Sequence, residues 1–354
     1  MQTLENRDLK PPEISSKHRG RLTILGAVLT ICGIALFAYF VYTVGFQEIL
    51  DNVDRFGFLG FAVILAIYFV RICMRALAWK LSVYEPYYLK MRDTIPAVIM
   101  GEALSSIIPL GIIISGTAKA VAVRNRVPFV VGLSSVATEN LFYSFTTSIF
   151  LILGAFTMVR SFKLEEGWVL TIDLLIAAMC VVVILLLLLV IRQWHFISET
   201  CEWLYQHGIA KGILEHGRMH VRLFENFIYG FYRRYPNRFL PIVLIEVAFH
   251  GLGILEVWFV LGRIADGLPQ FVTAFLLESV SRLITIVFKL VPFLIGVDEA
   301  GAQFVAETLG MVAGIGITLA IIRKARILFW AAVGIILIAT RGLPVRQVFE
   351  SKGD

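Results

Sequence analysis

The chain has 354 residues, of which 58% are hydrophobic and only 16% are charged, and its mean hydropathy is +0.82. This composition excludes an ordinary soluble protein, because most of the chain must be shielded from water. The net charge of +6 does not indicate a nucleic-acid partner, since the basic residues concentrate at the ends of apolar segments. The composition predicts an all-α polytopic membrane protein.

Six apolar runs are long enough to cross about 30 Å of hydrocarbon. They cover residues 22–43, 58–82, 128–158, 168–191, 239–262 and 310–340. We expect the first run to be a retained helix, because no small-residue cleavage signature follows it. The tail before it carries five basic and three acidic residues, which predicts a cytoplasmic N-terminus.

Two further apolar segments, 94–117 and 268–296, are interrupted by proline and glycine. If 94–117 spanned the membrane, its two basic flanks would lie on opposite sides, whereas re-entry with a turn at Pro109 keeps both inside. The segment 268–296 breaks at Pro292 and is expected to enter from the opposite face. The sequence therefore predicts about six transmembrane spans plus two re-entrant helical hairpins in an inverted-repeat arrangement.

In each half a charged residue within a long apolar helix follows the proline break at nearly the same distance. Glu139 follows Pro109 by 30 residues, and Arg323 follows Pro292 by 31 residues. Paired, interrupted hydrophobic segments in corresponding halves point to the binding site of a transporter. We expect a polar chamber where the two broken tips meet near the middle of the membrane.

The predicted organisation has five parts. These are a cytoplasmic tail (1–21), a first membrane half (22–191), a basic interfacial linker (192–238), a second membrane half (239–342) and a C-terminal cytoplasmic tail (343–354). The linker alternates aromatic with basic residues, which favours a helix lying on the cytoplasmic headgroups; a partner-binding helix is the alternative. The expected location is the cell (inner) membrane, with both termini cytoplasmic.

Charges inside apolar segments are candidate functional residues, since a lone charge at the bilayer centre costs at least about 2.5–3.5 kcal/mol. Arg71 and Arg75 project from one helix face and repel unless an anion or carboxylate lies between them. The alternative for Arg75 is that it extends to the cytoplasmic interface. Glu139 needs a cation, and Arg323 or Arg326 is the expected partner.

Other charged groups favour structural roles. The i, i+4 spacing of Glu278 and Arg282 predicts a helix pair that neutralises itself. Glu246 and His250 are expected to hydrogen bond to each other rather than to bind a metal, because no second histidine or Cys/His spacing accompanies them. No catalytic motif or ATP-binding motif is found, so we expect neither an enzyme nor a cofactor.

Several short motifs follow one another along the chain. They are Arg71-x3-Arg75-Ala-x-Ala-Trp79, Gly101-Glu102-Ala-Leu-Ser-Ser-x2-Pro109, Gly116-x2-Lys119, Glu139-Asn140, Pro292-x3-Gly296-Val-x-Glu299-Ala300 and Arg323-Lys-x-Arg326. In this order, from about residue 20 to 342, the chain resembles the flippase-like membrane region of lysylphosphatidylglycerol synthases and its stand-alone relatives. The resemblance implies inverted repeats and movement of a lipid headgroup between leaflets. The second break lacks the usual double glycine, and Lys119 stands where relatives tend to have arginine.

The leading hypothesis is a lipid flippase or transporter that moves an anionic or phosphate-containing headgroup by alternating access, with half-helix N-termini assisting. The lipid partner is a phospholipid or a polyprenyl- or hopanoid-type lipid. The predicted substrate-binding residues are Arg71, Arg75, Glu102, Pro109, Gly111, Gly116, Lys119, Pro292, Gly296 and Glu299. The predicted gate or charge network consists of Glu139, Arg323, Lys324, Arg326, Glu278 and Arg282.

Two alternatives belong to other classes. A membrane scaffold would use its charges only to hold helices together and its linker to dock a lipid-modifying enzyme. An intramembrane transferase would use Asp298 and Glu299, and is least favoured because these carboxylates lack a metal-ligand set or a nucleophile. The chain shows no soluble aminoacyl-transferase domain, so aminoacylation of lipid is not expected.

Overall fold

The computed structural model describes residues 42, 46–107, 111–161, 166–192, 196–207, 222, 225–265, 270–288, 295–311 and 313–341. These residues are 90% helical and include no strand, which confirms the predicted all-α class. The predicted first span, 22–43, lies outside the described residues except for Tyr42.

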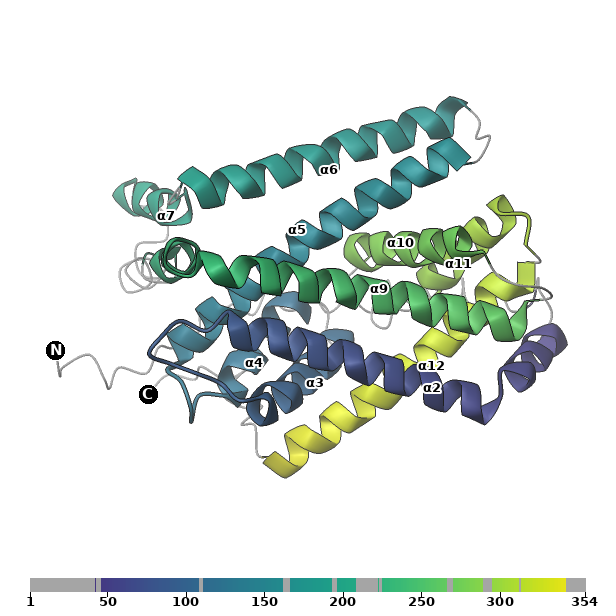
Figure 1. Ribbon diagram of the computed structural model, residues 1–354, viewed down its shortest axis with the longest axis horizontal. Helices are drawn as coiled ribbons and strands as arrows, with labels where there is room; N and C mark the ends of the chain where they lie inside the picture. Colours follow the sequence, from purple (N-terminus) through teal and green to yellow (C-terminus); the bar gives the residue numbers. More distant parts are fainter. Residues whose placement is uncertain are drawn as a thin grey trace.

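Figure 1 labels the helices in the order in which they follow one another along the chain. They are α2 (Phe46–Leu81), α3 (Met91–Ile107), α4 (Gly111–Ala122), α5 (Phe129–Ser161), α6 (Glu166–Arg192), α7 (Phe196–Gln206), the short 3-10 helix η1 (Pro236–Arg238), α9 (Phe239–Ile264), α10 (Phe271–Val287), α11 (Val297–Thr308) and α12 (Ala313–Arg341). Residues 225–234 are also helical. The α2 helix is kinked at Gly57, whose φ of 69° lies in the left-handed region that glycine adopts readily.

Three stretches are long and apolar enough to cross a membrane. They are Leu50–Leu81, Phe129–Ser161 and Pro236–Ile264, which correspond to three of the predicted spans. The helices α6 and α12 occupy the positions of two more predicted spans. Three basic residues interrupt the apolar character of α12. The total of six spans stays a prediction.

Each interrupted segment forms a pair of packed helices. The α3 helix packs on α4, and α10 packs on α11. In both halves a long helix then follows, α5 in the first and α12 in the second, so the element order repeats as the sequence predicts. The second pair extends beyond the predicted 268–296, since α11 begins only at Val297. Pro109 and Pro292 lie outside the described residues, and re-entry from one membrane face stays a prediction.

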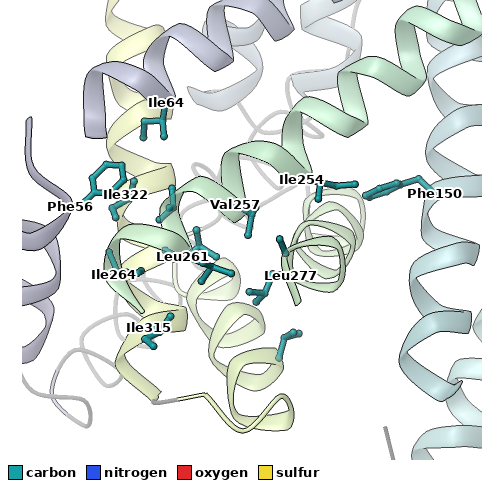
Figure 2. Close-up of a cluster of buried hydrophobic side chains, with 14 residues drawn as sticks. Phe56, Ile64, Phe150, Ile254, Val257, Leu261, Ile264, Leu277, Ile315 and Ile322 are labelled. Carbon is teal, nitrogen blue, oxygen red and sulfur yellow. The ribbon is translucent and has the colours of Figure 1, made fainter. Parts of the chain in front are cut away.

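A central apolar cluster joins the two halves (Figure 2). Ile254 and Leu261 of α9 lie among buried side chains from α2, α5, α10, α11 and α12, including Phe150, Leu277 and Ile322. Lipid tails are as apolar as these side chains, so close van der Waals packing holds membrane helices together. This packing fixes the relative positions of the helices that carry the charged residues.

The α6 helix lies at the side of the bundle, where it packs on α5 (Figure 1). Its exposed side chains are mostly large and apolar, namely Leu170, Leu174, Val181, Val182, Ile184, Leu185, Leu187 and Leu188. A helix with such a surface fits hydrocarbon rather than water.

The aromatic residues at the end of the predicted interfacial linker pack inside the protein. Phe231 and Tyr235 are buried with residues of α2, α5 and α9, and the Tyr84 ring meets Tyr235 edge to face at 5.4 Å. Arg233 and Arg234 remain exposed. Neighbouring helices therefore cover the aromatic side of residues 225–235 and leave the arginines at the surface, and the interfacial position of the linker stays a prediction.

Gly316 sets the approach of α12 to α11. A Cβ atom at this position would lie 2.5 Å from the carbonyl oxygen of Ala302. Because the obstacle is backbone, we expect Gly316→Ala to destabilise the fold by about 1–3 kcal/mol, measured as a lower thermal unfolding midpoint in detergent. Gly251→Ala is the matched control: nothing lies within 4 Å of its Cβ, and alanine favours a helix. Equal losses in both variants would contradict this assignment.

Candidate functional site

A cavity of about 240 Å³ lies within the bundle, and α2, α3, α10 and α12 supply most of its lining. It is lined by Tyr68, Arg71, Arg75, Glu102, Ala103, Ser105, Ser106, Tyr143, Phe249, Glu278, Ser281, Arg282, Thr285, Asp298, Arg323, Arg326, Ile327, Trp330 and Ala331. Five of these side chains are arginines and three are carboxylates, so the lining is positive overall.

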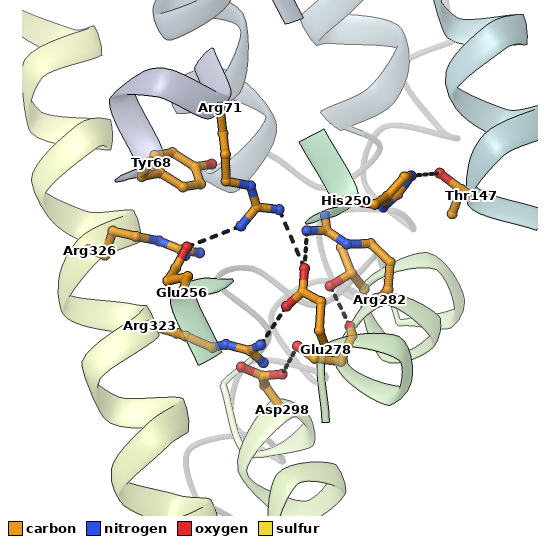
Figure 3. Close-up of polar contacts among 12 residues, drawn as sticks. Tyr68, Arg71, Thr147, His250, Glu256, Glu278, Arg282, Asp298, Arg323 and Arg326 are labelled. Atoms are coloured by element: carbon orange, nitrogen blue, oxygen red, sulfur yellow. Dashed lines mark hydrogen bonds and ion pairs between the residues drawn. The ribbon is translucent and has the colours of Figure 1, made fainter. Parts of the chain in front are cut away.

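Glu278 is the common partner of three arginines (Figure 3). Its carboxylate lies 2.6 Å from Arg282, 2.6 Å from Arg323 and 3.4 Å from Arg71. The predicted Glu278–Arg282 helix pair is confirmed, but it does not neutralise itself alone. One buried carboxylate instead ties α10 to α2 and α12.

Glu256 is a second shared carboxylate, supplied by α9. It lies 3.1 Å from Arg71 and also forms an ion pair with Arg326 (Figure 3). Arg71 therefore bridges the two carboxylates and joins α2 to both α9 and α10. The sequence shows Glu256 as an acid in an apolar helix, but nothing in its spacing predicts this partnership.

The arginine network keeps unused hydrogen-bond donors. Four arginines share the carboxylates of Glu256 and Glu278, and Glu102 and Asp298 line the same cavity. The Nε atoms of Arg71 and Arg326 and one terminal nitrogen of Arg323 are buried without a hydrogen-bond acceptor in the described part of the chain. Buried donors of this kind are costly unless an acceptor reaches them.

Aromatic rings cover the guanidinium planes. Arg71 lies 4.5 Å from the centre of the Phe249 ring, Arg326 lies 4.2 Å from Tyr68, and Arg75 lies 4.1 Å from Tyr143. Such cation–π contacts stabilise arginines away from water. They also hold the guanidinium planes in fixed orientations.

Arg75 is buried and paired, so the alternative in which it extends to the membrane interface is wrong. Its guanidinium lies 2.8 Å from Glu139 and donates to Asn140 at 3.3 Å. The predicted pairing of Glu139 with Arg323 or Arg326 is also wrong. Those two arginines are held by Glu278 and Glu256, on other helices.

Glu299 and Lys324 do not line the cavity. Glu299 accepts a hydrogen bond from the backbone N–H of Gly296 at 2.8 Å, which caps the start of α11. Lys324 forms an ion pair with the same carboxylate. Two residues predicted for binding and gating thus hold α11 against α12.

The remaining predicted binding residues divide between two places. Glu102 lines the cavity and accepts a hydrogen bond from the Tyr68 hydroxyl at 3.1 Å. Lys119 is 5% exposed on α4 but does not line the cavity, and neither does Gly116. Asp298 lines the cavity and accepts a hydrogen bond from Ser281 at 2.9 Å. The sequence assigned Asp298 only to the transferase alternative.

The predicted hydrogen bond between His250 and Glu246 is wrong. The Nε2 atom of His250 lies 3.1 Å from the Thr147 hydroxyl, and its ring stacks on Phe150. Both Glu246 oxygens are buried without a hydrogen-bond donor among the described residues. No group of three or more His, Cys, Asp or Glu side chains suited to a metal occurs in the same part of the chain.

Membrane-length helices around an arginine-lined cavity define a multi-pass helical membrane protein. The family model described as the lysylphosphatidylglycerol synthase TM region matches residues 23–334, and the chain belongs to this family. Membership indicates a membrane protein related to lipid metabolism or transport. No significant match to a curated protein or to a solved structure was found.

Proposed function

We propose that the protein moves a lipid with an anionic or phosphate-containing headgroup between the leaflets of the membrane. The single observation that carries this proposal is the set of five guanidiniums that line one cavity, three of which keep a buried nitrogen without an acceptor among the described residues. Membership of the lipid-related family supports the same conclusion.

The cavity chemistry favours an anion over a zwitterion or a cation. Guanidinium groups bind phosphate and carboxylate oxygens through paired hydrogen bonds and replace the water that such groups lose. In this proposal such oxygens reach the buried donors of Arg71, Arg323 and Arg326 when the surrounding helices shift, since these donors have no acceptor among the described residues. A cationic headgroup would instead meet like charges at close range.

The size of the cavity limits what it holds. Its volume of about 240 Å³ is below the roughly 300–1,000 Å³ of pockets that enclose a whole drug-sized ligand. A headgroup fits this space, and the acyl or prenyl tails stay in the surrounding lipid. Only the polar part of the lipid then needs the polar chamber, which avoids the largest desolvation cost.

The shared carboxylates supply a route for alternating access. Glu278 and Arg282 lie on α10, Arg71 lies on α2, and Arg323 lies on α12. A shift of the α10–α11 pair against α2 and α12 exchanges these ion pairs, and an anionic headgroup takes the place of a carboxylate while they exchange. In this proposal the network of Glu278 is both the site and the gate, and the lipid leaves chemically unchanged.

Leaflet exchange in liposomes tests the proposal. The purified protein is reconstituted with headgroup-labelled phosphatidylglycerol or phosphatidylcholine, and outer-leaflet label is destroyed by a membrane-impermeant quencher. We expect faster loss of labelled phosphatidylglycerol than in protein-free liposomes, little effect on phosphatidylcholine, and unchanged lipid masses afterwards. Equal exchange of both lipids, or an altered lipid product, would contradict the proposal.

A further inference from the structure

A second set of buried charges adjoins the cavity and is not used by the proposed headgroup site. It consists of Glu139 on α5, Glu246 on α9, Arg75 on α2 and Lys119 on α4. Glu246 is 0% exposed, Glu139 is 1% exposed and Lys119 is 5% exposed. Four helices therefore bring two acids and two bases together away from solvent.

The two carboxyl groups belong to α5 and α9, which pack on each other, and one turn further along both helices the Tyr143 ring stacks on His250 at 5.8 Å, which sets Glu139 beside Glu246. Arg75 is an ion-pair partner of Glu139 at 2.8 Å, yet none of the four carboxyl oxygens accepts a hydrogen bond from the described residues. Two ionised carboxylates only accept hydrogen bonds, so the contact between them is repulsive. A single proton turns one of them into a donor and removes half of the buried negative charge.

We infer that Glu139 and Glu246 form a proton-binding site in which the two carboxyl groups share one proton. The other charged and titratable groups around this carboxyl pair are Arg75 on α2, Glu102 on α3, Lys119 on α4, Tyr143 on α5, His250 on α9 and Arg282 on α10. Arg75 and Lys119 balance two carboxylates when both are ionised. With one proton bound, the same set carries a net charge of about +1, the difference between two bases and one remaining carboxylate.

Arg75 connects this proton site to the cavity. It pairs with Glu139 on one side and lines the cavity on the other. Protonation of the carboxyl pair weakens the hold of Glu139 on Arg75 and adds positive charge beside the cavity, and both effects favour an anion there. By linkage, an anion in the cavity also favours the proton. This coupling rests on the proposed function, whereas the proton site itself does not.

Infrared spectroscopy tests the proton site without any lipid movement. In the purified wild-type protein we expect the C=O stretching band of a buried, protonated carboxyl group, which shifts in D2O and disappears as the pH is raised. Glu139→Gln and Glu246→Gln should each remove this band. Glu199→Gln, which changes an exposed acid on α7, should keep it. A wild-type protein without the band, or a band that survives both glutamine substitutions, would overturn the proton site.

Binding of a short-chain phosphatidylglycerol to the detergent-solubilised protein tests the coupling. Wild-type affinity should rise about fivefold or more on acidification, the lower end of typical coupling between sites. Glu246→Gln, which fixes the protonated charge state, should bind tightly at every pH. If the variants do not fold, a pH indicator reports proton uptake by the wild-type protein when this lipid binds. A pH-independent wild-type affinity, or binding without proton uptake, would overturn the coupling.

Discussion

Replacing Arg71 with methionine should slow leaflet exchange of an anionic lipid by about tenfold or more. Arg71 is 2% exposed, lines the cavity and is the residue that joins Glu256 to Glu278. Its loss removes one of five guanidiniums available to the headgroup and disconnects α2 from the shared carboxylates. The rate is measured by quenching labelled phosphatidylglycerol in liposomes.

The fold should tolerate this change, because neither carboxylate is left alone. Glu256 keeps Arg326, and Glu278 keeps both Arg282 and Arg323. Methionine has a similar length and packs well in an apolar site. Arg192→Met, which removes an exposed arginine at the end of α6, should leave the exchange rate unchanged. A folded Arg71→Met protein with wild-type exchange would remove the arginine network from the mechanism.

Replacing Glu278 with alanine, unlike replacing Arg71, should destabilise the fold itself. We expect the free energy of unfolding to fall by about 3–5 kcal/mol. Among the described residues, Arg282 and Arg323 have ion pairs only with Glu278. Its removal therefore leaves the buried Arg323 and the partly buried Arg282 without their ion-pair partner, while Arg71 keeps Glu256. The loss is measured as a lower unfolding midpoint and a lower yield of folded protein in detergent.

A second substitution distinguishes the loss of ion pairs from a general packing defect. The double variant Glu278→Ala with Arg323→Met should be more stable than Glu278→Ala alone, since it removes one uncompensated charge. Asp173→Ala, which removes an exposed acid of α6, should change the midpoint little. A double variant less stable than Glu278→Ala would show that the ion pairs do not account for the loss.

The sequence predicted the helical class and the helix order of the two halves because both depend on local patterns. Apolar length, prolines and charge flanks are properties of each segment alone. For the same reason the i, i+4 pair of Glu278 and Arg282 was predictable. Charges inside apolar segments also identified several of the residues that line the cavity, including Arg71 and Arg323.

The partners of these charges were not predictable, because they depend on how each helix is rotated against its neighbours. Arg323, Lys324 and Arg326 are close in sequence but differ by roughly 100° per residue around α12. They consequently meet carboxylates of three different helices, Glu278 on α10, Glu299 on α11 and Glu256 on α9. No spacing within α12 distinguishes these partners.

The same limit explains the incorrect pairing of Glu139. Equivalent positions in two repeats suggested a contact between Glu139 and Arg323, but equivalence describes the order of elements and not their contacts. The structure places Glu139 of α5 on Arg75 of α2, and Arg323 of α12 on Glu278 of α10. The position of Glu139 beside Glu246 likewise becomes evident only once α5 and α9 are packed.

Photo-crosslinking tests most directly whether an anionic headgroup enters the arginine-lined cavity. The wild-type protein is reconstituted with phosphatidylglycerol that carries a photoreactive group on its headgroup, and the labelled residues are mapped by mass spectrometry after irradiation. The proposed function predicts labels on cavity-lining residues such as Ser105, Ser106, Ser281 and Thr285, with strong reduction in Arg71→Met. Labels confined to the exposed lipid-facing side chains of α6, with none in the cavity, would contradict it.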